Sequence, residues 1–120
     1  MWRSIRLDLK EKKAYWQEVS PEEVAMGGRY RTAKLLLEGE AYRFDPLAPE
    51  NPLVLAVGPL AGTGFSNANR TSVGTRSPLT LGIKEANGGG TFGYALGQMR
   101  LSHLVLEGRS PEWVVLRITR

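Results

Sequence analysis

The chain has 120 residues, 16 basic and 12 acidic side chains, a formal net charge of +4 and no cysteine. This length suits one domain spanning residues 1–120, and the lack of cysteine excludes a thiolate nucleophile and Cys-ligated zinc or iron–sulfur sites. The small, scattered charge argues against nucleic-acid binding. No apolar run reaches the roughly 20 residues of a membrane span, and the N-terminus lacks a signal-peptide core. We therefore expect a cytoplasmic protein that binds neither nucleic acid nor membrane.

The N-terminal segment predicts a β-hairpin. Apolar and polar residues alternate over residues 2–9, the sequence EKK at 11–13 turns the chain, and residues 14–19 return as a second strand. The alternation slips by one position near Arg3 and Ser4. We therefore expect the first residues to remain unpaired.

Two helices are predicted after the hairpin. Ser20 can cap a helix, Pro21 suits its first position and Glu23 completes a capping box. A second helix is expected over residues 29–38, ended by Gly39. This helix carries on one face the residues Tyr30, Ala33, Leu36 and Leu37.

The middle of the chain predicts buried strands separated by a long loop. Residues 53–57 (LVLAV) form a continuous apolar run between Pro52 and Gly58, which is typical of a strand buried on both faces. A loop at 58–70 and a strand at 71–77 follow. The sequence GIKEAN, just before the next glycines, does not read as a strand.

The last third predicts a short helix and two β-rich segments. The helix is expected at residues 91–100 and the β-rich segments at 103–108 and 113–119. Strands outnumber helices, so the fold class is α+β and β-rich, with an N-terminal hairpin and a few short helices. His103 begins an apolar strand, and we interpret it as structural rather than catalytic.

Ten of the fourteen glycines lie between Gly58 and Gly97. Glycine is costly in conformational entropy, so this concentration indicates tight loops or a pocket lined by backbone. The sequence GGGTFG at 88–93 matches the spacing G-x-G-x-x-G, but it lacks the preceding strand of a dinucleotide-binding unit. The sequence GPLAGTG at 58–64 lacks the Lys-Ser/Thr of a phosphate loop. Neither motif indicates a nucleotide site.

The turn at residues 87–90, Asn87 followed by three glycines and called here the glycine turn, nevertheless has the chemistry of an anion site. Free N–H groups at the start of a helix attract anions, glycines let a ligand touch the backbone, and arginines pair with phosphate in fork geometry. The candidate residues are Arg70, Arg76, Asn87, Gly88, Gly89 and Gly90. The alternative is that Asn87 only caps the helix and the two arginines are solvated.

Four sequence blocks resemble one known family. They are NPLVLAVGPLAGT, NRTSVGTRSPLT, EANGGGTFGYAL and HLVLEG, in this order along the chain. Together they resemble the N-terminal domain of the aldehyde ferredoxin oxidoreductases, and the resemblance covers nearly the whole chain. In that family the domain has two similar β-rich halves and forms a base for a bis-pterin cofactor.

The resemblance implies a cofactor and specific contacts. Family members carry tungsten, or molybdenum in some relatives, on a pterin (tungstopterin or molybdopterin), oxidise aldehydes and pass electrons to ferredoxin. It implies cofactor contacts at Arg70 and at the turn formed by Asn87 and the three glycines at 88–90. Arg76 stands where the family often has lysine. It implies neither a catalytic residue nor a metal ligand on this chain.

The sequence also departs from the family pattern. Gly88 replaces the usual serine of the turn, which removes a hydroxyl whose hydrogen bond would be worth roughly 0.5–1.5 kcal/mol. Ala68 and Asn69 replace the usual pair of glycines before the arginine. The cysteines of the iron–sulfur cluster and the catalytic acids of the much longer family enzymes are absent from this sequence.

Three hypotheses follow, and in none of them is the chain catalytic alone. The first is a cofactor-binding fragment or small subunit of such an oxidoreductase, completed by a larger subunit that carries the cluster. The second is a stand-alone pterin carrier that forms a homodimer. The third is a relic or repurposed domain that acts through protein interaction and binds no cofactor.

Overall fold

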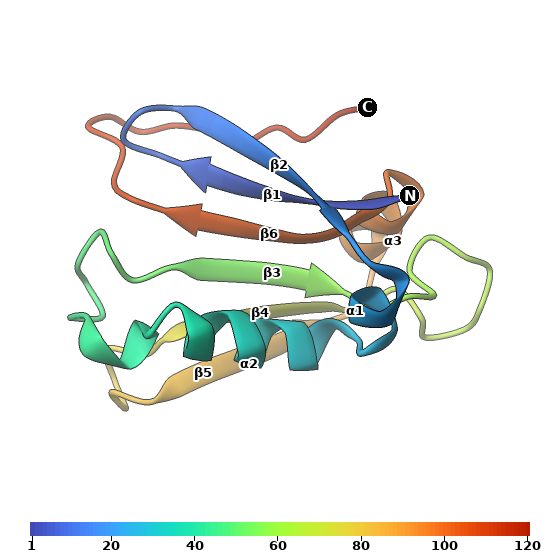
Figure 1. Ribbon diagram of the computed structural model, residues 1–120, viewed down its shortest axis with the longest axis horizontal. Helices are drawn as coiled ribbons and strands as arrows, with labels where there is room; N and C mark the ends of the chain where they lie inside the picture. Colours follow the sequence, from blue (N-terminus) through green and yellow to red (C-terminus); the bar gives the residue numbers. More distant parts are fainter.

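The computed structural model describes residues 1–120. Its central element is a mixed six-stranded sheet (Figure 1). The strands are β1 (Trp2–Asp8), β2 (Lys13–Val19), β3 (Leu53–Val57), β4 (Thr71–Arg76), β5 (Ile83–Gly88) and β6 (Leu101–Glu107). Their order across the sheet is β2-β1-β6-β3-β4-β5. Only β1 and β6 are parallel, and the other neighbours are antiparallel. The α+β class is confirmed.

Short helices pack on both faces of this sheet. They are α1 (Pro21–Ala25), α2 (Gly28–Glu38), the 3-10 turn η1 (Ala41–Arg43) and α3 (Thr91–Gln98). Leu36 of α2 packs with Val54 of β3, whereas Leu96 of α3 packs with Val57. Because side chains alternate between the two faces along a strand, α2 and α3 cover opposite faces. No helix combines the length and apolar character that crossing a membrane requires.

The predicted hairpin is confirmed, but the expectation of unpaired first residues is wrong. Trp2 pairs with Val19, and the antiparallel register runs without a break to the turn. The slip in the sequence pattern instead corresponds to a shift in register against β6, between Arg3 and Ser4. An irregularity of this kind changes which side chains face the core without ending the strand.

The predicted capping box is confirmed at the start of α1. The Ser20 hydroxyl accepts a hydrogen bond from the Glu23 N–H, and the Glu23 carboxylate accepts one from the Ser20 N–H. The strand predicted at 53–57 is also confirmed, as β3. Helix α2 begins one residue before the predicted position and ends at the predicted Glu38.

Of the four residues predicted to share one face of α2, only Leu36 is buried. Its buried residues are Arg31, Thr32 and Leu36, whereas Leu37 is 68% exposed. The reason is close packing on small residues of the sheet. A Cβ on Gly74 of β4 would lie 2.2 Å from the Thr32 methyl group, so this glycine lets the helix approach with its Thr32 side inward.

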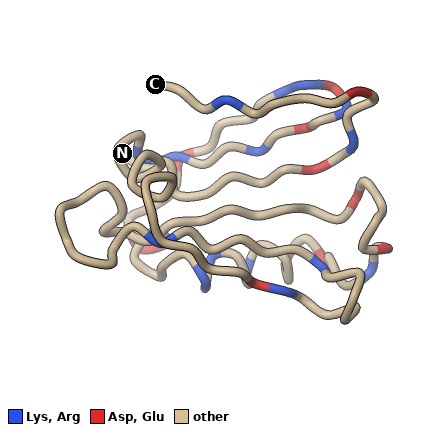
Figure 2. The backbone as a smooth tube through the Cα atoms, turned by 180° about the vertical axis from the view of Figure 1, so that it is seen from behind, with Lys and Arg blue, Asp and Glu red and all other residues tan.

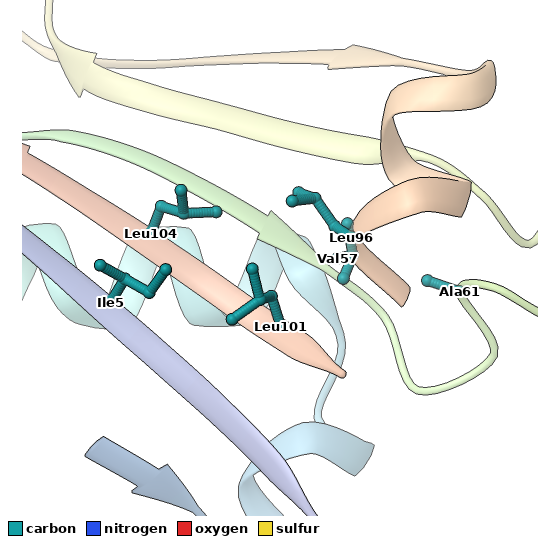
Figure 3. Packing of buried hydrophobic residues seen from close by; sticks show 6 residues of the cluster. All are labelled: Ile5, Val57, Ala61, Leu96, Leu101 and Leu104. Carbon is teal, nitrogen blue, oxygen red and sulfur yellow. The ribbon is translucent and has the colours of Figure 1, made fainter. Parts of the chain in front are cut away.

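The larger buried cluster lies on the α3 side of the sheet (Figure 3). Leu104 and Leu101 of β6 form its centre, with Ile5 from β1, Leu96 from α3 and Val57 from β3. Leu101, Leu104 and Leu96 are at most 1% exposed. This cluster joins β6, the central strand on this side, to the helix that follows the glycine turn.

Two expectations about β structure are wrong. Residues 83–88 form β5, an edge strand paired only with β4, although their sequence is largely polar or small. Conversely, residues 113–119 form no strand, and their N–H groups make no hydrogen bond within the chain. A polar edge strand is stabilised by its ladder partner, whereas an apolar extended segment without such a partner is not a strand.

His103 is buried in β6, as its structural interpretation requires. It is 8% exposed, and its Nδ1 lies 3.3 Å from the Ser102 hydroxyl. Burial lowers the pKa of His103 to about 4, and the nearby Arg31 charge acts in the same direction, as does Arg6, while Glu23 opposes them. The imidazole is therefore neutral in the folded protein at neutral pH.

We predict that the stability of the folded protein decreases as the pH is lowered, because of this single histidine. The pKa of His103 is lowered from 6.5 to about 4, so the unfolded chain binds a proton that the folded chain rejects in this window. Between pH 7 and pH 5 the free energy of unfolding should fall by about 2 kcal/mol, as measured by urea unfolding. His103→Gln should flatten this dependence.

An NMR titration of the folded protein provides the direct control. The His103 imidazole should stay neutral down to pH 5. A midpoint near the ordinary histidine value, or equal pH slopes for the wild type and His103→Gln, would contradict the prediction.

Candidate functional site

The two candidate arginines lie at opposite ends of strand β4, Arg70 just before its first residue and Arg76 as its last. Arg70 immediately precedes Thr71, which pairs with Gly88 of β5, whereas Arg76 pairs with Ile83. At about 3.4 Å per residue, the five positions from Thr71 to Arg76 separate the two ends by about 17 Å. The structure thus brings Arg70 to the glycine turn and does not bring Arg76 there.

Arg70 is held against Asn87. Its Nε donates a short hydrogen bond to Asn87 Oδ1, and its Nη2 donates to the Asn87 carbonyl oxygen at 3.2 Å. A Cβ on Gly89 would lie 3.6 Å from Arg70 Nη1, so this third nitrogen faces the glycine turn. Two nitrogens of the guanidinium are thus engaged with Asn87, and Nη1 lies beside Gly89.

The turn itself differs in part from the expected form. Asn87 and Gly88 belong to β5, so Asn87 does not cap a helix, and α3 begins only after Gly90. Gly90 has a φ of 136°, a conformation that favours glycine, and it provides no side-chain cap. The N–H groups of Gly89 and Gly90 make no hydrogen bond within the chain. These two amides are therefore free to donate to a ligand.

A hollow of about 370 Å³ lies over these donors. Its walls are formed by Asn67, Asn69, Arg70, Gly89, Gly90, Thr91 and Tyr94. Arg70 is the only charged residue among them and forms no ion pair within the chain. The loop before Arg70 carries no Lys, Arg, Asp or Glu from Gly58 to Asn69 (Figure 2). The hollow therefore combines an unneutralised cation with free amides.

The loop that forms one wall is packed backbone to backbone on α3. A Cβ on Gly97 would lie 2.1 Å from the Ala61 carbonyl carbon, and one on Gly93 would lie 2.4 Å from the Asn69 carbonyl oxygen. The Asn69 side chain adds a hydrogen bond, because its Oδ1 accepts from the Gly62 N–H at 2.8 Å. Asn69, a departure from the family pattern, thus fixes the loop beside Arg70.

Glu85 was missed as a site residue by the sequence reasoning. Its Oε1 accepts from Asn87 Nδ2 at 3.1 Å and from the Ser72 hydroxyl at 2.9 Å. Its Oε2 lies 3.6 Å from Arg29 Nε. The hydrogen bond from Asn87 lowers the pKa of Glu85, and Ser72 and Arg29 act in the same direction. The available sequence signal was that Glu85 is the only acid between Val54 and Leu106.

Arg76 has structural partners at the far end of β4. Its Nη1 donates to the Phe44 carbonyl at 2.5 Å, and its Nε donates to the Leu81 carbonyl at 2.8 Å. Asn51 also binds the Arg76 backbone in both directions, through its Oδ1 and Nδ2. Arg76 thus ties the β4–β5 turn to the loop after η1, while cofactor contact by Arg76 stays an untested prediction.

Comparison with known proteins identifies the family. Residues 4–120 match the aldehyde ferredoxin oxidoreductase N-terminal domain. The chain belongs to this family. It is 39% identical over 119 residues to the tungsten-containing aldehyde ferredoxin oxidoreductase of Pyrococcus furiosus and 37% identical to that of Thermococcus kodakarensis. Both alignments cover 97% of this chain and 20% of the relative, so the chain spans about a fifth of the length of these enzymes.

A solved structure supports the same fold. One chain of the active-site complex BamBC of benzoyl coenzyme A reductase, determined with 1,5-dienoyl-CoA, has a TM-score of 0.84 and 30% identity. The match covers 92% of this chain and 17% of that one. The aldehyde ferredoxin oxidoreductase N-terminal domain is therefore a part of larger chains in each of these cases.

We predict that Arg76→Ala destabilises the fold without affecting anion binding at the glycine turn. Loss of two hydrogen bonds from a charged donor should lower the free energy of unfolding by about 2 kcal/mol, measured by urea unfolding. Affinity for inorganic pyrophosphate, measured by calorimetry, should change less than about twofold, because the electrostatic effect of a charge this distant is screened. Weaker binding with unchanged stability would instead assign Arg76 to the ligand.

Proposed function

We propose that this chain supplies one face of a tungstopterin or molybdopterin site in an aldehyde ferredoxin oxidoreductase-type enzyme, and that it is not catalytic alone. The observation that carries the proposal is the Arg70 guanidinium, which forms no ion pair within the chain and lies beside the glycine turn and its two free amides. Backbone N–H groups together with a guanidinium suit phosphate oxygens. The tungsten named in the relatives supports a cofactor of this class.

The residues present fit the phosphate-bearing part of such a cofactor. The hollow of about 370 Å³ lies within the usual volume range of small-molecule pockets. Its donors are Arg70 Nη1 and the N–H groups of Gly89 and Gly90. Glycine at 89 and 90 leaves the backbone accessible to the phosphate oxygens. When bound, the cofactor would supply the metal and its dithiolene ligands for aldehyde oxidation. This chain would bind and orient the phosphate.

Polypeptide beyond these 120 residues is needed to complete such an enzyme. The chain spans a fifth of the relatives' length and has no cysteine for an iron–sulfur cluster. We therefore infer that further polypeptide of a larger oxidoreductase carries the cluster and covers the cofactor from the other side. A cytoplasmic location, without membrane or nucleic-acid binding, remains part of this proposal.

We predict that Arg70→Ala weakens binding of a phosphate-bearing pterin. Removing a charged donor from phosphate should raise the Kd about tenfold or more, measured by calorimetry at low salt. Arg43→Ala is the matched control, because it removes the same charge from an arginine already paired with Glu40 at 2.7 Å. An equal loss of affinity in both variants would show that the effect comes from net charge alone. Unchanged affinity in Arg70→Ala would contradict the proposed site.

A second candidate is a homo-oligomeric interaction or cofactor-carrier domain without redox activity. The exposed segment 113–119 favours it, because Trp113 is 103% and Val115 is 93% exposed and their N–H groups make no hydrogen bond within the chain. Apolar side chains and unpaired amides together suit pairing with a second strand.

This candidate predicts a dimer that depends on the exposed segment. Sedimentation velocity should show concentration-dependent association that Trp113→Ser abolishes. Leu79→Ser is the control, because Leu79 is 91% exposed in the turn between β4 and β5. A monomer at every concentration, or equal loss in both variants, would contradict the interaction hypothesis.

A further inference from the structure

We propose that Glu85 is a positioning residue for the phosphate site: it orients the Asn87 carboxamide, which in turn holds the Arg70 guanidinium beside Gly89. This inference rests on the proposed function and adds a residue to which neither the family resemblance nor the comparisons give a role. The three side chains form a continuous chain of contacts, from Glu85 Oε1 to Asn87 Nδ2 at 3.1 Å and from Asn87 Oδ1 to Arg70 Nε.

The chemistry of the acceptor fixes the direction of the carboxamide. An ionised carboxylate only accepts hydrogen bonds, so the NH₂ group of Asn87 must face Glu85 and its oxygen must face away. That oxygen is then available to Arg70, which only donates. With the carboxamide reversed, its NH₂ group would face the guanidinium, and both groups would present donors.

Register and burial place Glu85 for this role. In the β4–β5 ladder Asn87 pairs with Ser72 and Glu85 pairs with Gly74, so Glu85 and Asn87 share one face of β5. The Glu85 side chain is 23% exposed, which limits competition from water. Ser72 and Arg29 hold its two oxygens, and this leaves the carboxylate few other orientations.

Net charge and positioning predict opposite effects when this carboxylate is removed. Deleting an acid near an anion site makes the local potential more positive, so electrostatics alone would strengthen phosphate binding. If Glu85 positions Arg70 through Asn87, its removal frees the carboxamide and the guanidinium, and binding weakens. The direction of the change therefore distinguishes the two effects.

The first test measures pyrophosphate binding to the full chain by calorimetry. Glu85→Ala should raise the Kd about fivefold, which corresponds to the loss of about one hydrogen bond. Glu18→Ala is the control, because it deletes the same charge from β2 at the opposite edge of the sheet. Unchanged or tighter binding in Glu85→Ala would overturn the proposal.

A double-mutant cycle tests whether Glu85 acts through Asn87. In the Asn87→Ala background, Glu85→Ala should no longer raise the Kd, because the intermediate group is already missing and only the electrostatic effect, which tightens binding, is left. Additive losses would overturn the positioning role. Glu85→Gln should restore part of the affinity, because its carboxamide oxygen can still accept from Asn87 and Ser72.

A measurement without ligand separates this inference from the proposed function. In the free protein, the Arg70 Nε–H resonance should be visible and slow to exchange with water, and Glu85→Ala should broaden it or speed its exchange. If Arg70→Ala does not alter pyrophosphate binding, the proposed phosphate site is wrong. The Arg70 Nε–H resonance of the protein with Arg70 intact still tests the contacts from Glu85 through Asn87 to Arg70. If Glu85→Ala leaves the resonance unchanged, the positioning role fails even where Arg70 binds the anion.

Discussion

Close backbone contact between helix α3 and the loop after β3 is the constraint on which the site depends. At Gly97 and Gly93 there is no room for a side chain, because a Cβ would fall 2.1 Å and 2.4 Å from atoms of the loop. The Asn69 carboxamide closes the same contact from the loop side. Arg70 follows Asn69 directly, so the packing that joins α3 to the loop also places the guanidinium beside the turn that begins α3.

Electrostatics then distinguish the two candidate arginines. Arg70 is bonded to an uncharged carboxamide and forms no ion pair within the chain, and it lies beside free amides. Arg76 donates to the backbone carbonyls of Leu81 and Phe44, so its guanidinium stabilises the contact between two neighbouring turns. Both residues have the same chemistry, and Arg70 lines a hollow whose walls contain no carboxylate.

In its relatives this domain is one part of a longer polypeptide. In the Pyrococcus furiosus and Thermococcus kodakarensis enzymes the aligned region is a fifth of the chain. In this protein Trp113 and Val115 are exposed on a segment with no ladder partner. A surface that presents apolar side chains and unpaired amides together suits contact with further polypeptide.

The sequence by itself determined the features that rest on local chemistry. The capping box at Ser20 and Glu23, the hairpin alternation and the apolar run of β3 need only neighbouring residues, and the four quoted blocks identified the family. The tertiary structure decided what depends on distant partners. Pairing with β4 made a strand of the polar segment 83–88, whereas 113–119 lacked a partner and formed none. Gly74 turned Thr32 of α2 inward, and the length of β4 separated Arg76 from the glycine turn, because packing and register join residues that the sequence keeps apart.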